Sequence, residues 1–257
     1  MEFIIIGITA FLASILTFFS GFGLGTLLMP VFALFFEIEV AITLTGIVHL
    51  MNNLFKTTLI GKKINWNIVL RFGLPGFFGS LIGAYLLLTF SEVNKLISYT
   101  ILNHSFFVTP IKLFISFLIF IFAIVEIFPF YKNMSFNKNK IYIGGLISGF
   151  FGGLSGHQGA LRSAFLIRLN LSKESFIASG IMIATIVDVS RLSLYFTQYE
   201  KLNIIENFPA LITAIFCAFI GAYLGKRVLT KITIDLIQYS IITLLILLSL
   251  AMAMGLI

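Results

Sequence analysis

The chain alternates between long apolar segments and short polar connections along its whole length. The apolar segments cover residues 3–19, 24–36, 40–60, 68–90, 108–130, 141–154, 160–170, 175–197, 207–225 and 235–256. A helix needs about 20 apolar residues to cross the hydrocarbon core of a membrane. The stretches 3–36 and 141–170 each hold two segments divided by a glycine-rich turn, and neither is long enough for two full crossings. We therefore predict two broken or re-entrant helical hairpins, 3–36 and 141–170, and six transmembrane helices.

The composition agrees with an all-α integral membrane protein. Of 257 residues, 59% are hydrophobic and 11% charged, which is too apolar for a soluble core and its surface. The first apolar segment has neither a basic leader nor a small-residue cleavage site, so we expect it to stay in the membrane. Cys217 is the only cysteine, which excludes an internal disulfide and leaves no cluster of soft metal ligands. We expect no metal and no cofactor.

The chain also repeats itself, because matching residues recur at a constant offset of 135. The matching pairs are Ser20 and Ser155, Gly21 and Gly156, Asn53 and Asp188, and Lys56 and Arg191. The motif IGAYL occurs at 82 and again at 220. We predict an N-terminal repeat, 1–133, with spans 40–60, 68–90 and 108–130, and a C-terminal repeat, 134–257, with spans 175–197, 207–225 and 235–256. Both belong to one membrane domain.

The charged residues of the loops predict the topology. The net charge is +7, but most Lys and Arg residues lie in the connections between apolar spans. They therefore indicate the orientation of the chain in the membrane and not nucleic-acid binding. The basic loop residues are Lys62, Lys63 and Arg71, Lys132, Lys138 and Lys140, Arg168 and Lys173, and Lys226, Arg227 and Lys231. By the positive-inside rule these loops, including the linker 131–140, are cytoplasmic and both termini are periplasmic. The two repeats then run in opposite directions, and inverted repeats with broken helices are typical of secondary transporters.

The second break, Gly152–Arg162, carries the polar residues that point to a ligand. Four glycines interrupt the helix, while Ser155, His157, Gln158 and Arg162 bring polar groups into apolar sequence. A half-helix that restarts after such a break presents unpaired backbone N–H groups, which favour an anion. Arg162 follows the turn by one helical turn and could pair with an oxyanion. The alternatives are a glycine-rich packing seam with Arg162 reaching water, a hairpin carbonyl bound by His157, and helix capping by Ser155 and Gln158.

Polar residues on two spans add to this candidate site. His49, Asn53 and Lys56 share one helix face, with Asn52 beside them. Asp188 and Arg191 lie three residues apart, so a helix-internal ion pair explains them equally well. Lys56 and Arg191 could also reach the membrane surface. The functional interpretation is that these residues line two vestibules and take part in gating or coupling. Histidine titrates near neutral pH, and we rank His157 first and His49 second as carriers of a coupling proton.

Three segments resemble the sulfite exporter TauE/SafE family in the same order. They are FFSGFGLGTLLMP at 18–30, HLMNNLFK at 49–56 and GGLSGHQGALR at 152–162. The resemblance implies a carrier of sulfite, sulfonates or other small sulfur-containing or organic anions in the bacterial plasma membrane. The first break has no His or Arg, so the two hairpins should contribute unequally. The candidate substrate-binding residues are Ser20, Gly21, Gly23, Gly25, Asn52, Asn53, Ser155, Gly156, His157, Gln158 and Arg162.

Two other functions compete with a secondary active exporter. An anion channel would also use glycine-rich constrictions and basic residues. A membrane enzyme is the third class, but the spans hold no paired carboxylates, no His-rich metal spacing and no nucleophile with an evident base. The expected partners are therefore a small anion, the lipid bilayer and a coupling proton, while the sequence leaves the oligomeric state open.

Overall fold

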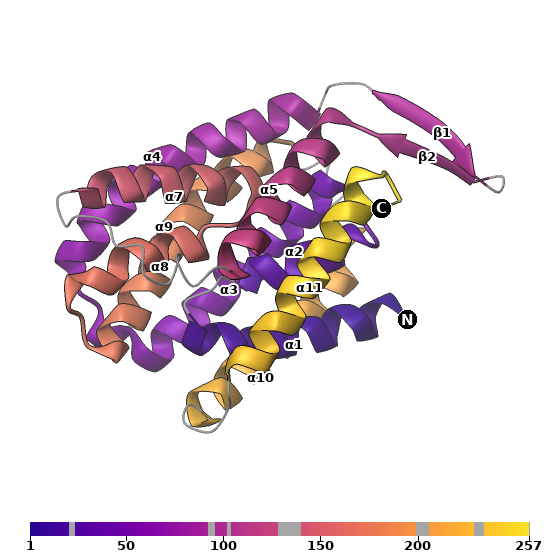
Figure 1. The fold of residues 1–257 in the computed structure, drawn as a ribbon. Helices are drawn as coiled ribbons and strands as arrows, with labels where there is room; N and C mark the ends of the chain where they lie inside the picture. The colour runs from indigo at the N-terminus through magenta and orange to yellow at the C-terminus, as the bar shows by residue number, and fades with distance from the viewer. Residues whose placement is uncertain are drawn as a thin grey trace.

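The computed structural model describes residues 1–20, 24–91, 96–101, 104–127, 140–198, 206–228 and 234–256. Within these ranges the chain is a bundle of helices (Figure 1). The α-helices are α1 (Glu2–Ser20), α2 (Leu24–Ala33), α3 (Ile38–Ile60), α4 (Trp66–Ser91), α5 (Pro110–Ile127), α7 (Ile141–Ser155), α8 (Gly159–Leu166), α9 (Lys173–Tyr195), α10 (Phe208–Val228) and α11 (Ile234–Ala253). Short 3₁₀ helices are η1 (Gly61–Lys63), η3 (Ile167–Leu169) and η4 (Phe196–Gln198).

The predicted all-α membrane fold is confirmed. In the described part of the chain, four helical stretches are long and apolar enough to cross a membrane: Ile38–Lys63, Trp66–Phe90, Lys173–Gln198 and Phe208–Arg227. Large apolar side chains also cover the outside of the bundle, among them Phe78 on α4 and Phe216 on α10. A water-soluble protein rarely exposes so continuous an apolar surface, whereas lipid tails accept it. The chain is a multi-pass membrane protein.

The second helix break lies inside the glycine-rich sequence that predicts it. Helix α7 ends at Ser155, and Gly156 follows with a φ of 80°, in the left-handed region that a side chain would strain. The Gly156 N–H still donates to the Gly152 carbonyl, 3.0 Å away. Helix α8 then restarts at Gly159 and runs for only 8 residues. In the first hairpin, α1 and α2 flank residues 21–23, which lie outside the described residues.

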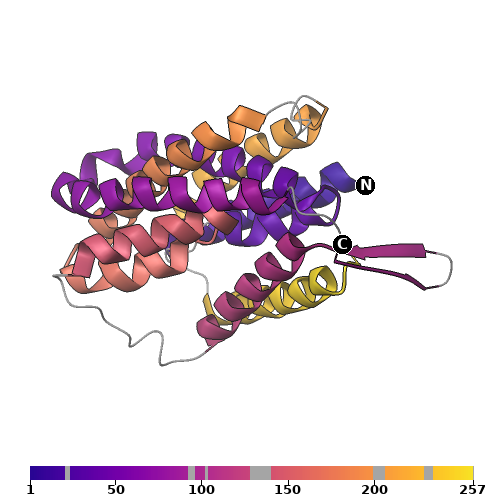
Figure 2. The ribbon, with the colours of Figure 1, turned by 90° about the horizontal axis from the view of Figure 1, so that it is seen from above.

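The helices of the two halves pack against each other in matching pairs. Helix α1 packs along α10 and α7 packs along α4, so the first helix of each half lies against the fourth helix of the other half. Helices α3 and α9 contact each other in the centre of the bundle, and α5 lies beside α11, as both views show (Figures 1 and 2). The short half-helices instead pack within their own halves, α2 on α3 and α8 on α9, and these two pairs also match.

Helices α4 and α7 approach each other closely because glycines face one another. A Cβ added to Gly149 would lie 2.6 Å from the Gly76 Cα, and one added to Gly153 would lie 2.7 Å from the Ser80 carbonyl carbon. No side chain fits between backbones at that distance. Small residues at helix interfaces are the usual means of close packing in membranes. This contact holds α7, and with it the helix break, against the central part of the bundle.

The sequence analysis does not predict the two-stranded β-hairpin of the described fold. Strands β1 (Ile97–Ile101) and β2 (His104–Val108) pair antiparallel, with Ile97 opposite Val108. The hairpin projects from the end of the bundle where both termini lie (Figure 2). The span predicted to begin at 108 therefore begins at Pro110, because Val108 completes the β-ladder.

The basic connections gather at one end of the bundle. Lys226, near the end of α10, donates to the Leu59 carbonyl at the end of α3, 3.2 Å away. The Asn65 N–H, just before α4, donates to Ser179 Oγ near the start of α9, 2.9 Å away. Helix α4 runs from this end to the end that bears the β-hairpin. Lys62, Lys63, Lys226 and Arg227 consequently lie at the end opposite the hairpin.

Candidate functional site

The centre of the bundle holds a carboxylate that accepts hydrogen bonds from four side chains. Asp188 of α9 is fully buried. Its Oδ1 accepts from Arg191 Nε at 3.0 Å, from Arg191 Nη2 at 2.8 Å and from Gln158 Nε2 at 3.4 Å. Its Oδ2 lies 2.6 Å from His49 Nδ1 and 3.3 Å from Asn53 Nδ2. We call these five residues the Asp188 cluster. Its members come from α3, from the helix break and from α9.

The helix-internal ion pair predicted between Asp188 and Arg191 is confirmed. The alternative that Arg191 extends to the membrane surface is wrong, because its side chain is 0% exposed. The physical reason is that this face of α9 packs against α3, α4 and α7, which leaves no route to water. Arg191 Nη1 also lies 3.4 Å from the Gly152 carbonyl, and Tyr195 donates to the Gly153 carbonyl. Both carbonyls belong to the last turn of α7, and the Gly152 carbonyl also accepts the Gly156 N–H.

The start of α2 adjoins the second helix break beside the Asp188 cluster. A Cβ added to Gly25, at the start of α2, would lie 3.4 Å from the Gly156 carbonyl oxygen and 3.4 Å from Thr45 Cγ2 on α3. A Cβ added to Gly156 would lie 3.2 Å from Arg191 Nη1. Of the candidates in the first break, Gly25 therefore reaches the junction. Gly21, Gly23 and the side chain of Ser20 lie outside the described residues.

Asn52 and Lys56 face a different part of the bundle from His49 and Asn53. Lys56 donates to Thr17 Oγ1 at 3.2 Å, and Asn52 lies 3.0 Å from Ser14 Oγ, so both residues contact α1. With the Asn52 amide turned so that its nitrogen faces Ser14, its oxygen accepts from Lys56 Nζ at 3.2 Å. Lys56 is only 3% exposed, so the alternative that it extends to the membrane surface is wrong. The polar residues predicted on α3 thus contact two different helices: His49 and Asn53 contact α9, whereas Asn52 and Lys56 contact α1.

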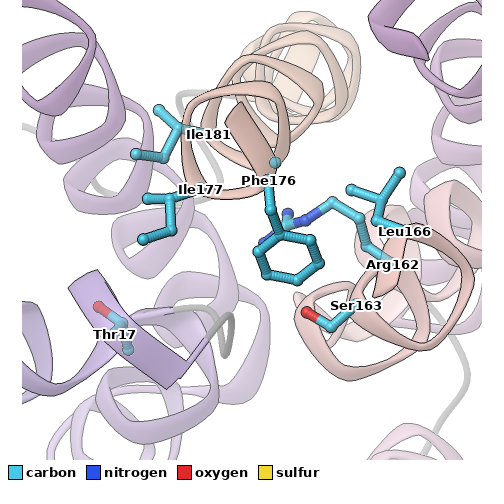
Figure 3. Close-up of a pocket in the computed structure, with 8 residues that line it drawn as sticks. Thr17, Arg162, Ser163, Leu166, Phe176, Ile177 and Ile181 are labelled. Carbon is cyan, nitrogen blue, oxygen red and sulfur yellow. The ribbon is translucent and has the colours of Figure 1, made fainter. Parts of the chain in front are cut away.

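Arg162 lines a hollow between α1, α8 and α9. The hollow is small and partly open, and its polar lining comes from Arg162, Thr17 and Ser163. In Figure 3 the Arg162 side chain extends from α8 toward α9 behind the ring of Phe176. It passes beside Gly180, where an added Cβ would lie 3.4 Å from Arg162 Nε, an ordinary contact distance. Arg162 is 6% exposed, so the alternative in which it extends to open water is wrong.

The remaining polar residues of the break have separate partners. His157 Nδ1 lies 2.9 Å from the Ser155 carbonyl, which is the hairpin hydrogen bond considered from the sequence. Its ring stacks on Phe122, with centroids 5.8 Å apart and planes within 4°. Ser155 Oγ donates to the Phe151 carbonyl. Gln158 occupies the N-cap position of α8, but its side chain makes no capping bond because its amide turns to Asp188 instead.

Sequence reasoning missed four polar residues that the structure brings to these sites, one of which is Ser163 in the lining of the hollow. Tyr195 follows Arg191 by four residues and Asp188 by seven, so it lies on the same face of α9. Ser14 and Thr17 are three residues apart on α1 and face the polar side of α3. For these other three the helical spacing was a usable signal. An isolated hydroxyl in an apolar helix, however, gives no indication of which neighbour it will meet.

The chemistry of both places suits an anion. The Asp188 cluster and the Arg162 hollow offer guanidinium, imidazole, amide and hydroxyl donors. Among the described residues, no group of three or more His, Cys, Asp or Glu side chains is arranged to hold a metal ion. Donors that converge on one point in a water-poor interior are the usual means of stabilising negative charge.

Comparison with known protein families gives one finding. A family model described as sulfite exporter TauE/SafE matches residues 6–252. The match spans both hairpins, the Asp188 cluster and the Arg162 hollow. No curated protein and no solved structure matches the chain.

Proposed function

We propose that this chain, which belongs to the sulfite exporter TauE/SafE family of membrane transporters, is a secondary active carrier that exports sulfite or a closely related small oxyanion. The membrane is the bacterial plasma membrane, with both termini in the periplasm. The basic end of the bundle is then cytoplasmic. The Arg162 hollow lies toward this end, because Ile177 and Gly180 in its lining are close to Ser179, which contacts the loop before α4. The hollow is thus the cytoplasmic entrance for the anion.

The observation that carries this proposal is the position of Arg162. A guanidinium within apolar sequence is expensive to keep in a membrane and usually marks a functional site. Arg162 follows the helix break by one turn, and its side chain lines the hollow beside two hydroxyl-bearing residues, Thr17 and Ser163. Asp188 has Arg191 as its nearer cation. A planar guanidinium can bind two oxygens of an oxyanion at once, which favours sulfite or a similar ion as the ligand.

Inverted repeats support a carrier in preference to a simple pore. The matching helix pairs fit two halves related by a two-fold axis in the membrane plane. Asn53 and Asp188, which correspond at the offset of 135 residues, lie within 3.3 Å of one another. Equivalent positions can contact each other only close to the axis that relates the repeats. The start of α2 meets the second helix break at the same point, and carriers of this architecture bind their substrates where broken helices meet.

Replacing Arg162 tests the proposal directly. We expect the sulfite affinity of Arg162→Ala to fall roughly tenfold to a hundredfold or more, because a charge-assisted contact contributes on the order of 1.5 to 3 kcal/mol. Arg162→Lys should also lose most of the binding, since an ammonium cannot form the two parallel bonds. Affinity is measured by titration calorimetry on purified protein.

The matched control is Arg71→Ala, which removes an exposed Arg from α4 outside the hollow. This variant should bind sulfite like the wild type. Wild-type affinity in well-folded Arg162→Ala would contradict the role of Arg162. A thermal-shift panel of sulfite, sulfate, thiosulfate, sulfoacetate, taurine and carboxylates then identifies the preferred anion, because ligands stabilise by mass action. Saturable counterflow in proteoliposomes indicates a carrier, whereas currents that scale with driving force indicate a channel.

A further inference from the structure

We propose that the donors around Asp188 form an anion-binding site that the protein's own carboxylate occupies in this conformation. The transported anion competes with Asp188 for these donors, and the displaced carboxylate takes up a proton. This inference rests on the proposed anion transport and adds to it the position of the central site and the origin of proton coupling. The site consists of His49, Asn53, Gln158 and Arg191, with Asp188 as the built-in ligand.

The number and origin of the donors carry the inference. A structural ion pair on one helix would need only Arg191, which already binds Oδ1 through two nitrogens. Here three further donors reach the same carboxylate from elsewhere: His49 and Asn53 from α3 and Gln158 from the helix break. These side chains offer Asp188 only donor groups, which would suit a free oxyanion equally well. Gln158 even forgoes the capping bond of its own helix to point at this position.

The location also suits a transport site. The cluster lies beside the point where Gly25, at the start of α2, approaches Gly156 in the second break. Along α9, Asp188 is seven residues beyond Ile181 of the hollow, or roughly 10 Å at the rise of an α-helix. An anion that enters past Arg162 must therefore move toward the cluster to cross the bundle. Asp188 occupies the position that such an anion would need.

Charge balance connects anion binding to a proton. The ionisable groups facing Asp188 are His49 from α3, Arg162 from α8, and Arg191 and Tyr195 from α9 itself. If an anion takes over the donors of the cluster, the displaced carboxylate stays within the bundle without them. An ionised carboxylate in such surroundings is costly, so it binds a proton from the aqueous side. Each bound anion thus carries one proton onto the protein, on Asp188.

Two measurements on the full-length protein test this coupling. The first is infrared difference spectroscopy of the wild type, in which sulfite binding should produce the carbonyl band of a newly protonated carboxyl group. The second is titration calorimetry with sulfite in buffers of different ionisation enthalpy, which gives the number of protons taken up. We expect the wild type to take up one proton more per sulfite than Asp188→Asn. Any proton that sulfite itself gains or loses on binding is counted equally in both proteins. The difference between the two proteins therefore reports on Asp188.

Asp188→Asn should also bind sulfite at least tenfold more tightly, because an amide competes weakly for the donors. Its infrared band should be absent. The control is Glu39→Gln, which removes an acidic group of α3 outside the cluster and should match the wild type in affinity, proton uptake and infrared band. If sulfite binds to the wild type without a new carboxyl band, Asp188 is a structural ion-pair partner and the inference is overturned. This measurement decides even if Asp188→Asn does not fold.

Equal proton uptake by the wild type and Asp188→Asn, with unchanged or weaker affinity in the variant, would also overturn the inference. The proposed function fails in a different way. In that case sulfite and the related anions do not bind the wild type at all, or Arg162→Ala keeps full affinity. The two failures are therefore distinguishable.

Discussion

The two histidines of the membrane interior differ in what they contact, and this difference bears on proton coupling. His49 lies 2.6 Å from the Asp188 carboxylate, so its charge state acts on the centre of the cluster. His157 packs flat against Phe122 and bonds the Ser155 carbonyl, which is a local structural role. The sequence analysis ranks His157 above His49 for proton coupling, whereas the contacts favour His49 as the histidine that acts on coupling, because it adjoins Asp188, the proposed proton carrier.

This reassignment predicts opposite effects for two matched substitutions. In His157→Gln, the pH profile of sulfite transport should stay that of the wild type, since the glutamine amide can still donate to the Ser155 carbonyl. In His49→Gln, the profile should change, because a neutral amide replaces the titratable neighbour of Asp188. The other charged groups that face position 49, Arg191 and Arg162, remain in this variant. Uptake of sulfite into proteoliposomes at a series of pH values measures both. A shifted profile in His157→Gln beside an unchanged one in His49→Gln would restore the original ranking.

At the residue scale, local relations could be predicted and distant ones could not. The spacing of Asp188 and Arg191 predicts their ion pair, and the spacing of His49 and Asn53 predicts their common face. The contact between His49 and Asp188 joins residues 139 apart in the chain. This contact depends on how α3 packs against α9. The apolar pattern of each helix predicts which face is buried, but it does not predict which other helix packs on that face. The division of Asn52 and Lys56 toward α1 escaped prediction for the same reason.

Among the secondary-structure elements, the helices follow from their apolar lengths and the β-hairpin does not. The segment 97–108 precedes a long apolar run, and its five-residue strands give too short a pattern to stand out from a helix start. The close packing of α4 and α7 was also not predicted. The glycines of α7 were considered only as a break or a seam, and their partner helix lies more than fifty residues earlier in the chain.

The contact between α4 and α7 predicts a marked loss of stability on adding one methyl group. In Gly149→Ala the new Cβ would collide with the backbone of Gly76, which cannot rotate away as a side chain could. We expect a loss of about 1 to 3 kcal/mol, the usual cost of overpacking, measured by unfolding of the purified protein in detergent.

The control for this experiment is Gly61→Ala at the end of α3. There φ is −59°, which any residue adopts, and the nearest neighbour of the added Cβ would be the Thr57 methyl. A Gly149→Ala protein as stable as Gly61→Ala would show that the two helices can separate at little cost. The helix break would then need another support.

For the whole molecule, the all-α membrane fold could be predicted from the apolar lengths, because these depend on composition, whereas the division into two inverted repeats stays a prediction. The side of the membrane on which each end lies depends on loop charge alone. In the structure the basic residues of η1 and of the end of α10 gather at one end, while both termini and the β-hairpin lie at the other (Figure 1). This clustering agrees with the positive-inside rule but does not itself say which end is cytoplasmic.

Reporter fusions can decide the orientation. We expect a periplasmic reporter, such as alkaline phosphatase, to be active when fused after Ile257, and a cytoplasmic fluorescent reporter to be dark there. A cytoplasmic reporter inserted in the linker 131–140 should be active. The physical reason is that Lys62, Lys63, Lys226 and Arg227 resist transfer across the membrane and hold their end of the bundle inside. A cytoplasmic C-terminus would reverse the molecule, place the Arg162 hollow on the periplasmic side, and turn the proposed entrance for export into an exit.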